Sequence, residues 1–192
     1  MKTVRTSLFE TNSSSIHALV ISKNNNINIV PIESHSDDNY GIDPKYLHDP
    51  NIKFDYLITA LKYEIQRNKK MTDQGVDMSK SYINYSDNIN EDPEKQLEEL
   101  EKILVENHVP FKIFNKFGDG YIDCSNSVVC DIIPELLKDP NKLMRYLFND
   151  DSYLRTGNDG DNYITDLICG VVDDDPRHII NGEKFDYLIA AI

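Results

Sequence analysis

Hydrophobic residues recur at two spacings along the chain, which separates predicted strands from predicted helices. Apolar and β-branched residues predict strands over residues 4–9 and 16–21, and an alternation over 27–32 predicts a third strand. From residue 53 the spacing is helical and predicts an amphipathic helix of about four turns, ending near residue 70 in a basic stretch. The polar residues 35–46 are predicted to form a surface loop.

Two Asp-Pro pairs mark predicted helix starts after residue 90. Asp92 and Asp139 stand where N-caps are expected, because the proline after each fits the first helical position. A helix over residues 128–137 is predicted to break or restart at Pro134. The apolar residues 185–192 predict a short helix at the end.

Turn residues delimit the remaining predicted strands. Residues 109–117 alternate between apolar and polar positions, and the glycine-containing turn 118–120 predicts a β-hairpin with a strand over 121–123. Residues 152–156 predict one more strand, closed by a turn over 157–160.

Strands and helices that come in runs, rather than in strict alternation, favour an α+β fold. The expected architecture is a mainly antiparallel sheet with three or more helices packed on one face. A chain of 192 residues fits a single domain, residues 1–192, with its own core. The polar residues 71–91 are predicted to form a flexible insertion.

Two segments of the chain are nearly identical. Residues 53–61 and 184–192 share seven of nine positions, although their flanks differ. Two copies are too few for a repeat architecture. The likeness indicates either two helix starts with similar packing demands, or two helices docked in equivalent places on a pseudo-symmetric sheet.

The chain is strongly acidic, with a formal net charge of −13 and a pI near 4.7. Such a field repels phosphate and anionic lipid, so direct binding of nucleic acid or membrane is not expected. The densest basic stretch, residues 62–80, is interpreted as the solvated end of a helix, because acidic neighbours nearly cancel its charge. The acidity either keeps the protein soluble or forms a binding face for a basic partner.

Neither a metal nor a cofactor is expected. Cys124, Cys130 and Cys169 lack the spacing of a metal site, and reduced thiols are the default for an odd count of this kind. No apolar run is long enough for a signal peptide or a membrane span, so the protein is expected in the cytoplasm.

The polar link over residues 12–15 is the first candidate for chemistry. It joins two predicted strands, and its small side chains let successive N–H groups converge on a phosphate or carboxylate. His17 lies on the same strand face as Ser15, within reach of a shared ligand. Three interpretations stay open: a structural turn with a core-edge histidine, a ligand-binding loop, and a serine nucleophile.

Two further polar clusters follow predicted strands. Asp123 and Ser125 alternate onto one face, although Asn126 or Ser127 could simply cap the next helix. The turn over residues 156–162 carries carboxylates and amides that could bind a ligand, but its spacing fails the calcium-loop pattern. The alternative interpretation is a plain surface turn.

Three short segments together resemble a group of uncharacterised proteins from bacteriophages and their low-GC Gram-positive hosts. The segments are residues 4–21, 120–123 and 147–159. In that group the first segment typically reads FETNSSSTHS, the second YIDH, and the third a strand leading into TGND or TDND. This chain departs from the pattern at Ile16, Ala18 and Cys124. Because Cys124 replaces a usual histidine, the resemblance lends less support to an enzyme here.

Two functions are expected from these observations, and no catalytic residue is assigned. The first is a phage-type acidic accessory protein that binds and inhibits a basic host or anti-phage defence protein in the host cytoplasm. In one form of this hypothesis, the accessory protein acts as a nucleic-acid mimic. The alternative is a small enzyme or ligand-binding domain acting on a phosphorylated or nucleotide-like compound. Its predicted ligand-binding residues, expected to converge at one edge of the sheet, are Asn12, Ser13, Ser14, Ser15, His17, Asp123, Ser125, Thr156, Asn158 and Asp159.

Overall fold

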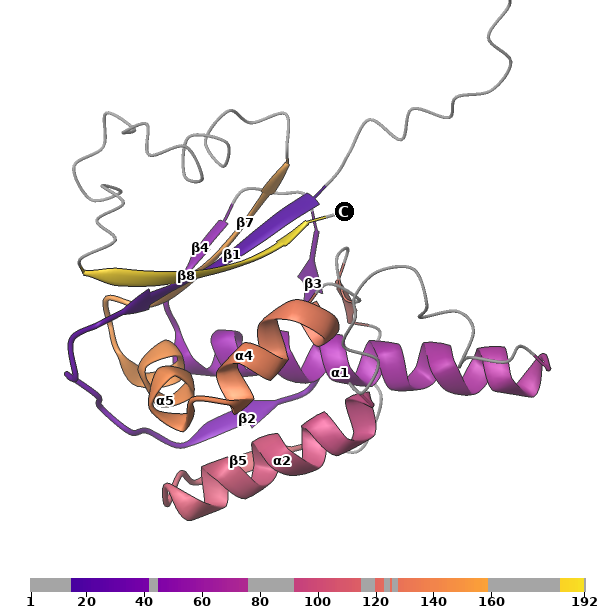
Figure 1. Ribbon diagram of the computed structural model, residues 1–192, viewed down its shortest axis with the longest axis horizontal. Coiled ribbons are helices and arrows are strands. Elements are labelled where there is room, and N and C mark those ends of the chain that lie inside the picture. Colours follow the sequence, from indigo (N-terminus) through magenta and orange to yellow (C-terminus); the bar gives the residue numbers. More distant parts are fainter. Residues whose placement is uncertain are drawn as a thin grey trace, which may run out of the picture.

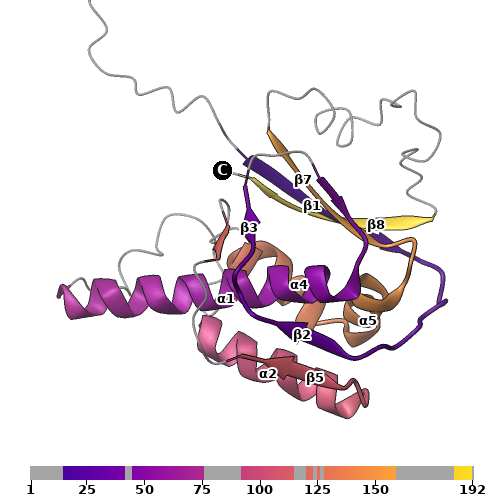
Figure 2. The same ribbon diagram turned by 180° about the vertical axis from the view of Figure 1, so that it is seen from behind.

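The structure is a computed structural model that describes residues 15–41, 45–75, 92–114, 120–122, 125, 128–158 and 184–191. These residues form a four-stranded antiparallel sheet with a layer of helices on one of its faces (Figures 1 and 2). Two small parallel sheets complete the described part. The expected α+β fold, with a mainly antiparallel sheet and helices on one face, is confirmed.

The main sheet has the strand order β4-β7-β1-β8, and its members are β4 (Lys45–Leu47), β7 (Tyr153–Asn158), β1 (Ser15–Ser22) and β8 (Phe185–Ala191). One small parallel sheet pairs β2 (Ile32–Ser34) with β5 (Phe111–Ile113). The other pairs β3 (Asn39–Tyr40) with β6 (Tyr121–Ile122).

The helices of the described part are α1 (Pro50–Asp73), α2 (Pro93–Glu106), α4 (Ile133–Leu137) and α5 (Pro140–Phe148). A π-helical segment, η2 (Val128–Ile132), runs directly into α4. The predicted interruption of this helix near Pro134 is therefore confirmed, because the helix type changes just before the proline.

Aspartate caps start the longer helices. Asp92 accepts from the Glu94 N–H at 3.1 Å, and Asp139 accepts from the Lys142 N–H at 3.1 Å, so both predicted caps are confirmed. A third pair, Asp49-Pro50, starts α1 in the same way. The predicted start at residue 53 missed this cap. With 24 residues, α1 is also longer than the predicted four turns.

The core lies between the main sheet and α1. Leu19 and Ile21 of β1 belong to the same buried hydrophobic cluster as Phe54 and Leu61 of α1. Every residue from 53 to 62 is buried, so this part of α1 is enclosed on all sides. A helix at the centre of the molecule needs more than the single apolar stripe of a surface helix.

The second copy of the near-repeat is a strand and not a helix. Residues 53–58 and 184–189 have the same sequence, yet the first copy lies within α1 and the second includes most of β8. β8 pairs with β1 from Ile16↔Ala191 to Ser22↔Phe185, and it forms the edge of the sheet (yellow in Figure 1). The predicted terminal helix was wrong, and the two copies do not occupy equivalent places.

Other predictions from the sequence were also wrong, in whole or in part. β5 and β6 do not form a hairpin, because each pairs in parallel with a strand from the first half of the chain. The expected surface loop over residues 35–46 is correct in part, because most of its described residues are exposed, but it contains β3 and the start of β4, and Tyr40 is only 3% exposed. Lys62, assigned to a solvated helix end, is buried, and its ammonium donates to the Phe114 carbonyl at 2.6 Å.

Some predictions fall partly or wholly outside the described residues. The strand over residues 4–9 does so entirely. Of the predicted insertion over 71–91, residues 71–73 belong to α1 and residues 76–91 are not described. Among the described helices, none combines the length and the apolar composition needed to cross a bilayer.

Candidate functional site

Half of the ten ligand-binding residues predicted from the sequence lie outside the described part of the chain. These are Asn12, Ser13, Ser14, Asp123 and Asp159, and their roles stay predictions. The structure describes the other five, and it places them in two separate regions.

The first and third polar segments lie side by side in the main sheet. β1 and β7 pair so that Ser15 stands opposite Asn158 and His17 stands opposite Thr156. Residues 12–14 precede Ser15 and residue 159 follows Asn158, so the chain enters and leaves this strand pair at the same end of the sheet.

His17 and Thr156 are nevertheless enclosed in the protein. The His17 side chain is 0% exposed and Thr156 is 1% exposed. The Nε2 atom of His17 lies 3.4 Å from the Gly41 carbonyl, so we assign the proton to Nε2. Nδ1 then accepts from the Tyr56 hydroxyl at 3.1 Å. The imidazole is thus held between β1, α1 and the chain after β3, and a solvent-borne substrate does not reach it.

Ser125 belongs to a different region of the protein. Its hydroxyl donates at 2.6 Å to Glu64, a carboxylate that is only 1% exposed and that also binds Arg67. Along α1, Glu64 lies about 12 Å from Tyr56, the partner of His17, at the helical rise per residue. The adjoining strand β6 pairs with β3 and not with the main sheet. The expectation that all three polar segments share one sheet edge was therefore wrong for this middle segment.

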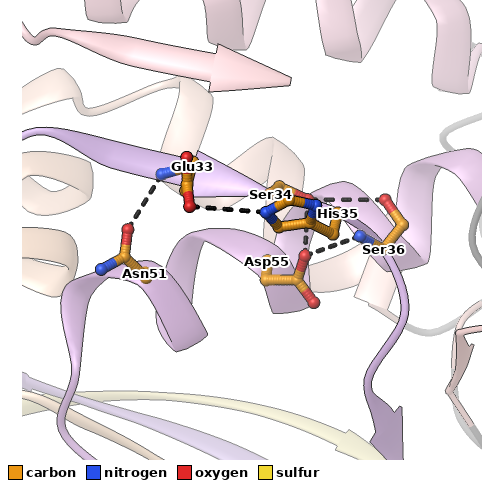
Figure 3. Close-up of polar contacts among 6 residues, drawn as sticks. All are labelled: Glu33, Ser34, His35, Ser36, Asn51 and Asp55. Carbon is orange, nitrogen blue, oxygen red and sulfur yellow. Dashed lines mark hydrogen bonds and ion pairs between the residues drawn. The ribbon is translucent and has the colours of Figure 1, made fainter. Parts of the chain in front are cut away.

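A buried carboxylate that sequence analysis did not single out organises the region beside His17. Asp55 accepts hydrogen bonds from Ser34 Oγ at 2.6 Å, the Ser36 N–H at 2.8 Å, the Tyr40 hydroxyl at 3.1 Å and Thr59 Oγ1 at 3.3 Å. Figure 3 shows the first two of these contacts, which join α1 to the chain around β2. With four donors around it, Asp55 is a structural acceptor that holds β2, β3 and α1 together.

Two backbone features place the donors of Asp55. Ser36 adopts a positive φ of 56°, and this conformation accompanies the hydrogen bond from its N–H to the carboxylate. Gly120 donates its N–H to the Ser36 carbonyl at 2.9 Å, and a Cβ at Gly120 would lie 2.2 Å from that oxygen. Glycine is required at this close approach.

The tyrosines form a chain of contacts from Asp55 to His17. Burial, together with the charges of Asp55 and Asp38, raises the pKa of Tyr40, so its hydroxyl stays a donor. The Tyr40 ring meets the Tyr56 ring edge-on at 5.2 Å between centroids, and Tyr56 bonds to His17. The strand β1 and the carboxylate of α1 are thus linked through buried polar and aromatic contacts.

An acidic cleft lies over the exposed side of this cluster. It has a volume of about 360 Å³, and its lining residues are Glu33, His35, Asp37, Asp38, Asn51, Ile52 and Asp55. Figure 3 shows the Glu33 N–H bonded to Asn51 Oδ1, at 2.9 Å, and His35 beside the Glu33 carboxylate, with 3.4 Å between Nε2 and Oε1. The cleft carries four carboxylates, of which those of Glu33, Asp37 and Asp38 are exposed.

Among the described residues, positive charge near the cleft is limited and partly buried. Burial lowers the pKa of Lys62, while the charges of Asp55 and Asp37 oppose this change. His35 stacks on Phe114 with 4.0 Å between ring centroids, and its Nε2 faces Glu33. The cleft is therefore suited to a cationic group, which three exposed carboxylates would meet.

Within the described ranges, no three His, Cys, Asp or Glu side chains are grouped so that they could hold a metal ion. Comparisons of the chain with protein-family models, with curated proteins and with solved structures gave no match. The function is therefore argued from the geometry.

The sequence contained a signal for this cleft. Glu33, Asp37 and Asp38 stand within six positions of one another in a stretch with an excess of acid. The contribution of Asp55 was hidden, because it lies within a predicted helix, where a carboxylate is ordinarily a solvated residue.

Proposed function

We propose that this protein is an acidic accessory protein that binds a basic surface of another protein and thereby blocks it. The observation that carries the proposal is the acidic cleft, where Glu33, Asp37 and Asp38 stand exposed beside the buried carboxylate of Asp55. The resemblance to phage and low-GC Gram-positive proteins suggests the class of partner, namely a host or anti-phage defence protein.

The overall charge supports this proposal. At −13 the chain repels phosphate and attracts cationic surfaces, which speeds encounter with a basic partner. The cleft adds a local site at which arginine or lysine side chains of the partner would make charge-assisted hydrogen bonds.

The positions of the sequence-predicted residues favour this function over catalysis by them. His17 and Thr156 are enclosed, and Ser125 donates to Glu64. A general base or nucleophile must reach its substrate, and these side chains lack that access.

A capture experiment tests the proposal. The immobilised 192-residue chain is exposed to an extract of a low-GC Gram-positive host, and bound protein is then eluted in steps from about 0.05 M to about 0.3 M salt, where exposed ion pairs weaken. We expect a basic protein that elutes as salt rises and whose activity falls when the purified chain is added.

A matched pair of variants controls for total charge. The cleft variant carries Glu33→Gln, Asp37→Asn and Asp38→Asn, and the helix variant carries Glu98→Gln, Glu101→Gln and Glu106→Gln on α2. Both lose three negative charges, but only the first changes the cleft. Failure to capture any salt-sensitive basic protein would overturn the proposed function.

One observation favours the alternative, a ligand-binding domain for a phosphorylated or nucleotide-like compound. The β1–β7 register brings the polar residues of two distant segments to the same end of the sheet. Replacing Asn12, Ser13 and Ser14 together by alanine would abolish binding of such a compound, as read by calorimetry with nucleoside mono-, di- and triphosphates. Unchanged binding by that variant would refute this alternative.

A further inference from the structure

A second hollow adjoins the acidic cleft. It has a volume of about 390 Å³, and its lining residues are Pro31, Ile32, Glu33, Asn51, Pro110, Phe111 and Lys112. Glu33 and Asn51 line both hollows, so the two are neighbours along β2 and the start of α1, and together we call them the groove. We name the second hollow the proline chamber, after Pro31 and Pro110.

The two halves of the groove differ in chemistry. Four of the seven residues of the proline chamber are apolar, whereas four of the seven residues of the acidic cleft are carboxylates. The one lysine of the chamber, Lys112, directs its ammonium over the Phe114 ring, 3.9 Å from the centroid. That contact holds the lysine on an aromatic surface.

Glu33 is held in place where the halves meet. Its N–H donates to Asn51 Oδ1 at 2.9 Å, which joins β2 to the first turn of α1, and its carboxylate faces His35 Nε2 at 3.4 Å. Asp55 already accepts four hydrogen bonds, so Glu33, Asp37 and Asp38 are the carboxylates with capacity for a ligand.

We propose that this groove binds an extended segment of the partner protein in which an apolar side chain stands two residues from an arginine or lysine. The carboxylates of the acidic cleft complement the charge of the arginine or lysine, and the adjoining apolar surface would bury the apolar side chain. Side chains at positions i and i+2 of an extended chain point to the same side, so both would enter one groove. This inference rests on the proposed function and names the chemistry of its partner.

A peptide titration tests the inference without knowledge of the partner. The ¹⁵N-labelled 192-residue chain is titrated with the peptide acetyl-Leu-Gly-Arg-amide and followed by NMR. We expect saturable shifts of the backbone amides of Glu33, Asn51 and Lys112. Replacing leucine by glycine, or arginine by citrulline, would each weaken binding about tenfold, because each removes one of the two matched contacts.

The cleft variant and the helix variant distinguish binding in the groove from an effect of total charge. The cleft variant would weaken binding of this peptide about tenfold, whereas the helix variant would bind like the wild type. The inference is overturned if the three amides show no saturable shifts, if both altered peptides bind as well as the parent, or if the helix variant weakens binding equally.

The outcomes distinguish the inference from the proposed function. If a basic partner is captured by the wild type and less well by the cleft variant, but the peptide does not bind, the proposed function stands and the groove inference fails. If the peptide binds as expected and no partner is captured, the groove inference stands and the proposed function fails.

Discussion

Lys53 offers a quantitative test of the structure through the pH dependence of stability. Its side chain is 0% exposed, and its ammonium donates to the carbonyls of Asn149 at 3.3 Å and Ser152 at 3.0 Å. Burial lowers the pKa of Lys53 from 10.5 to about 8, while the charges of Asp150 and Asp49 oppose this effect. We consider the substitution Lys53→Met, which keeps an unbranched side chain one heavy atom shorter and removes the charge.

The direction in which stability changes with pH follows from the number of protons that each state binds. Between pH 8 and 10.5 the unfolded chain keeps a proton on Lys53 that the folded protein has released, so stability rises with pH in this window. The full effect is about 3 kcal/mol, since each unit of pKa is worth about 1.4 kcal/mol. About 2 kcal/mol of this is gained between about pH 7 and about pH 9.5.

The assay is urea unfolding of the wild type and Lys53→Met across that pH range, read by circular dichroism. We expect the wild type to gain about 2 kcal/mol relative to the variant as pH rises. Loss of the ammonium also leaves two carbonyls without this donor, which lowers the stability of the variant at every pH. The test is therefore how the difference in free energy of unfolding between the two proteins changes with pH, and not its absolute size. Lys95→Met, at a side chain that is 79% exposed, would show no such change. A wild-type-to-Lys53→Met difference that stays constant with pH would refute the reasoning.

Further predictions concern the buried polar groups, and thermal or urea unfolding checks each of them. Tyr146→Phe raises the free energy of unfolding by about 1 kcal/mol, because the Tyr146 hydroxyl is buried with no hydrogen-bond partner among the described residues. Tyr40→Phe lowers the free energy of unfolding by about 1 to 2 kcal/mol, because it removes a hydrogen bond to the Asp55 carboxylate. Equal signs for the two would contradict this. Asp55→Asn lowers stability by about 2 to 3 kcal/mol, since one acceptor oxygen becomes a donor amide facing donors; an unchanged midpoint would refute its role. Gly120→Ala is strongly destabilising because its Cβ would meet the Ser36 carbonyl at 2.2 Å, and wild-type stability of this variant would disprove that packing.

Local signals in the sequence predicted those parts of the fold that depend on neighbouring residues. The caps at Asp92 and Asp139 were correct, because an N-cap is decided within one helical turn. The strand β7 and the break before Pro134 were also found, since proline and alternation act locally. The pairing of β5 with β2 and of β6 with β3 was missed, because partners so distant along the chain leave no local pattern.

The candidate site divides in the same way. The exposed carboxylates Glu33, Asp37 and Asp38 are visible as an acidic stretch of sequence. Their assembly over Asp55 depends on the packing of β2 against α1, which no spacing predicts. Conversely, His17 was a reasonable candidate from its neighbours, and only the packing of Tyr56 against it showed that it is enclosed.

The near-repeat shows most directly where local information ends. The six residues Lys-Phe-Asp-Tyr-Leu-Ile occur twice, and their intrinsic preferences are the same in both places. At residues 53–58 they follow the Asp49 cap and are buried in the central helix, whereas at 184–189 they lie along the open edge of β1, whose backbone groups supply hydrogen bonds. Composition, charge and the helix starts at Asp92 and Asp139 can therefore be read from the chain alone. The choice between helix and strand for the same six residues is made by the surroundings, because tertiary hydrogen bonds and burial outweigh the small differences in local propensity.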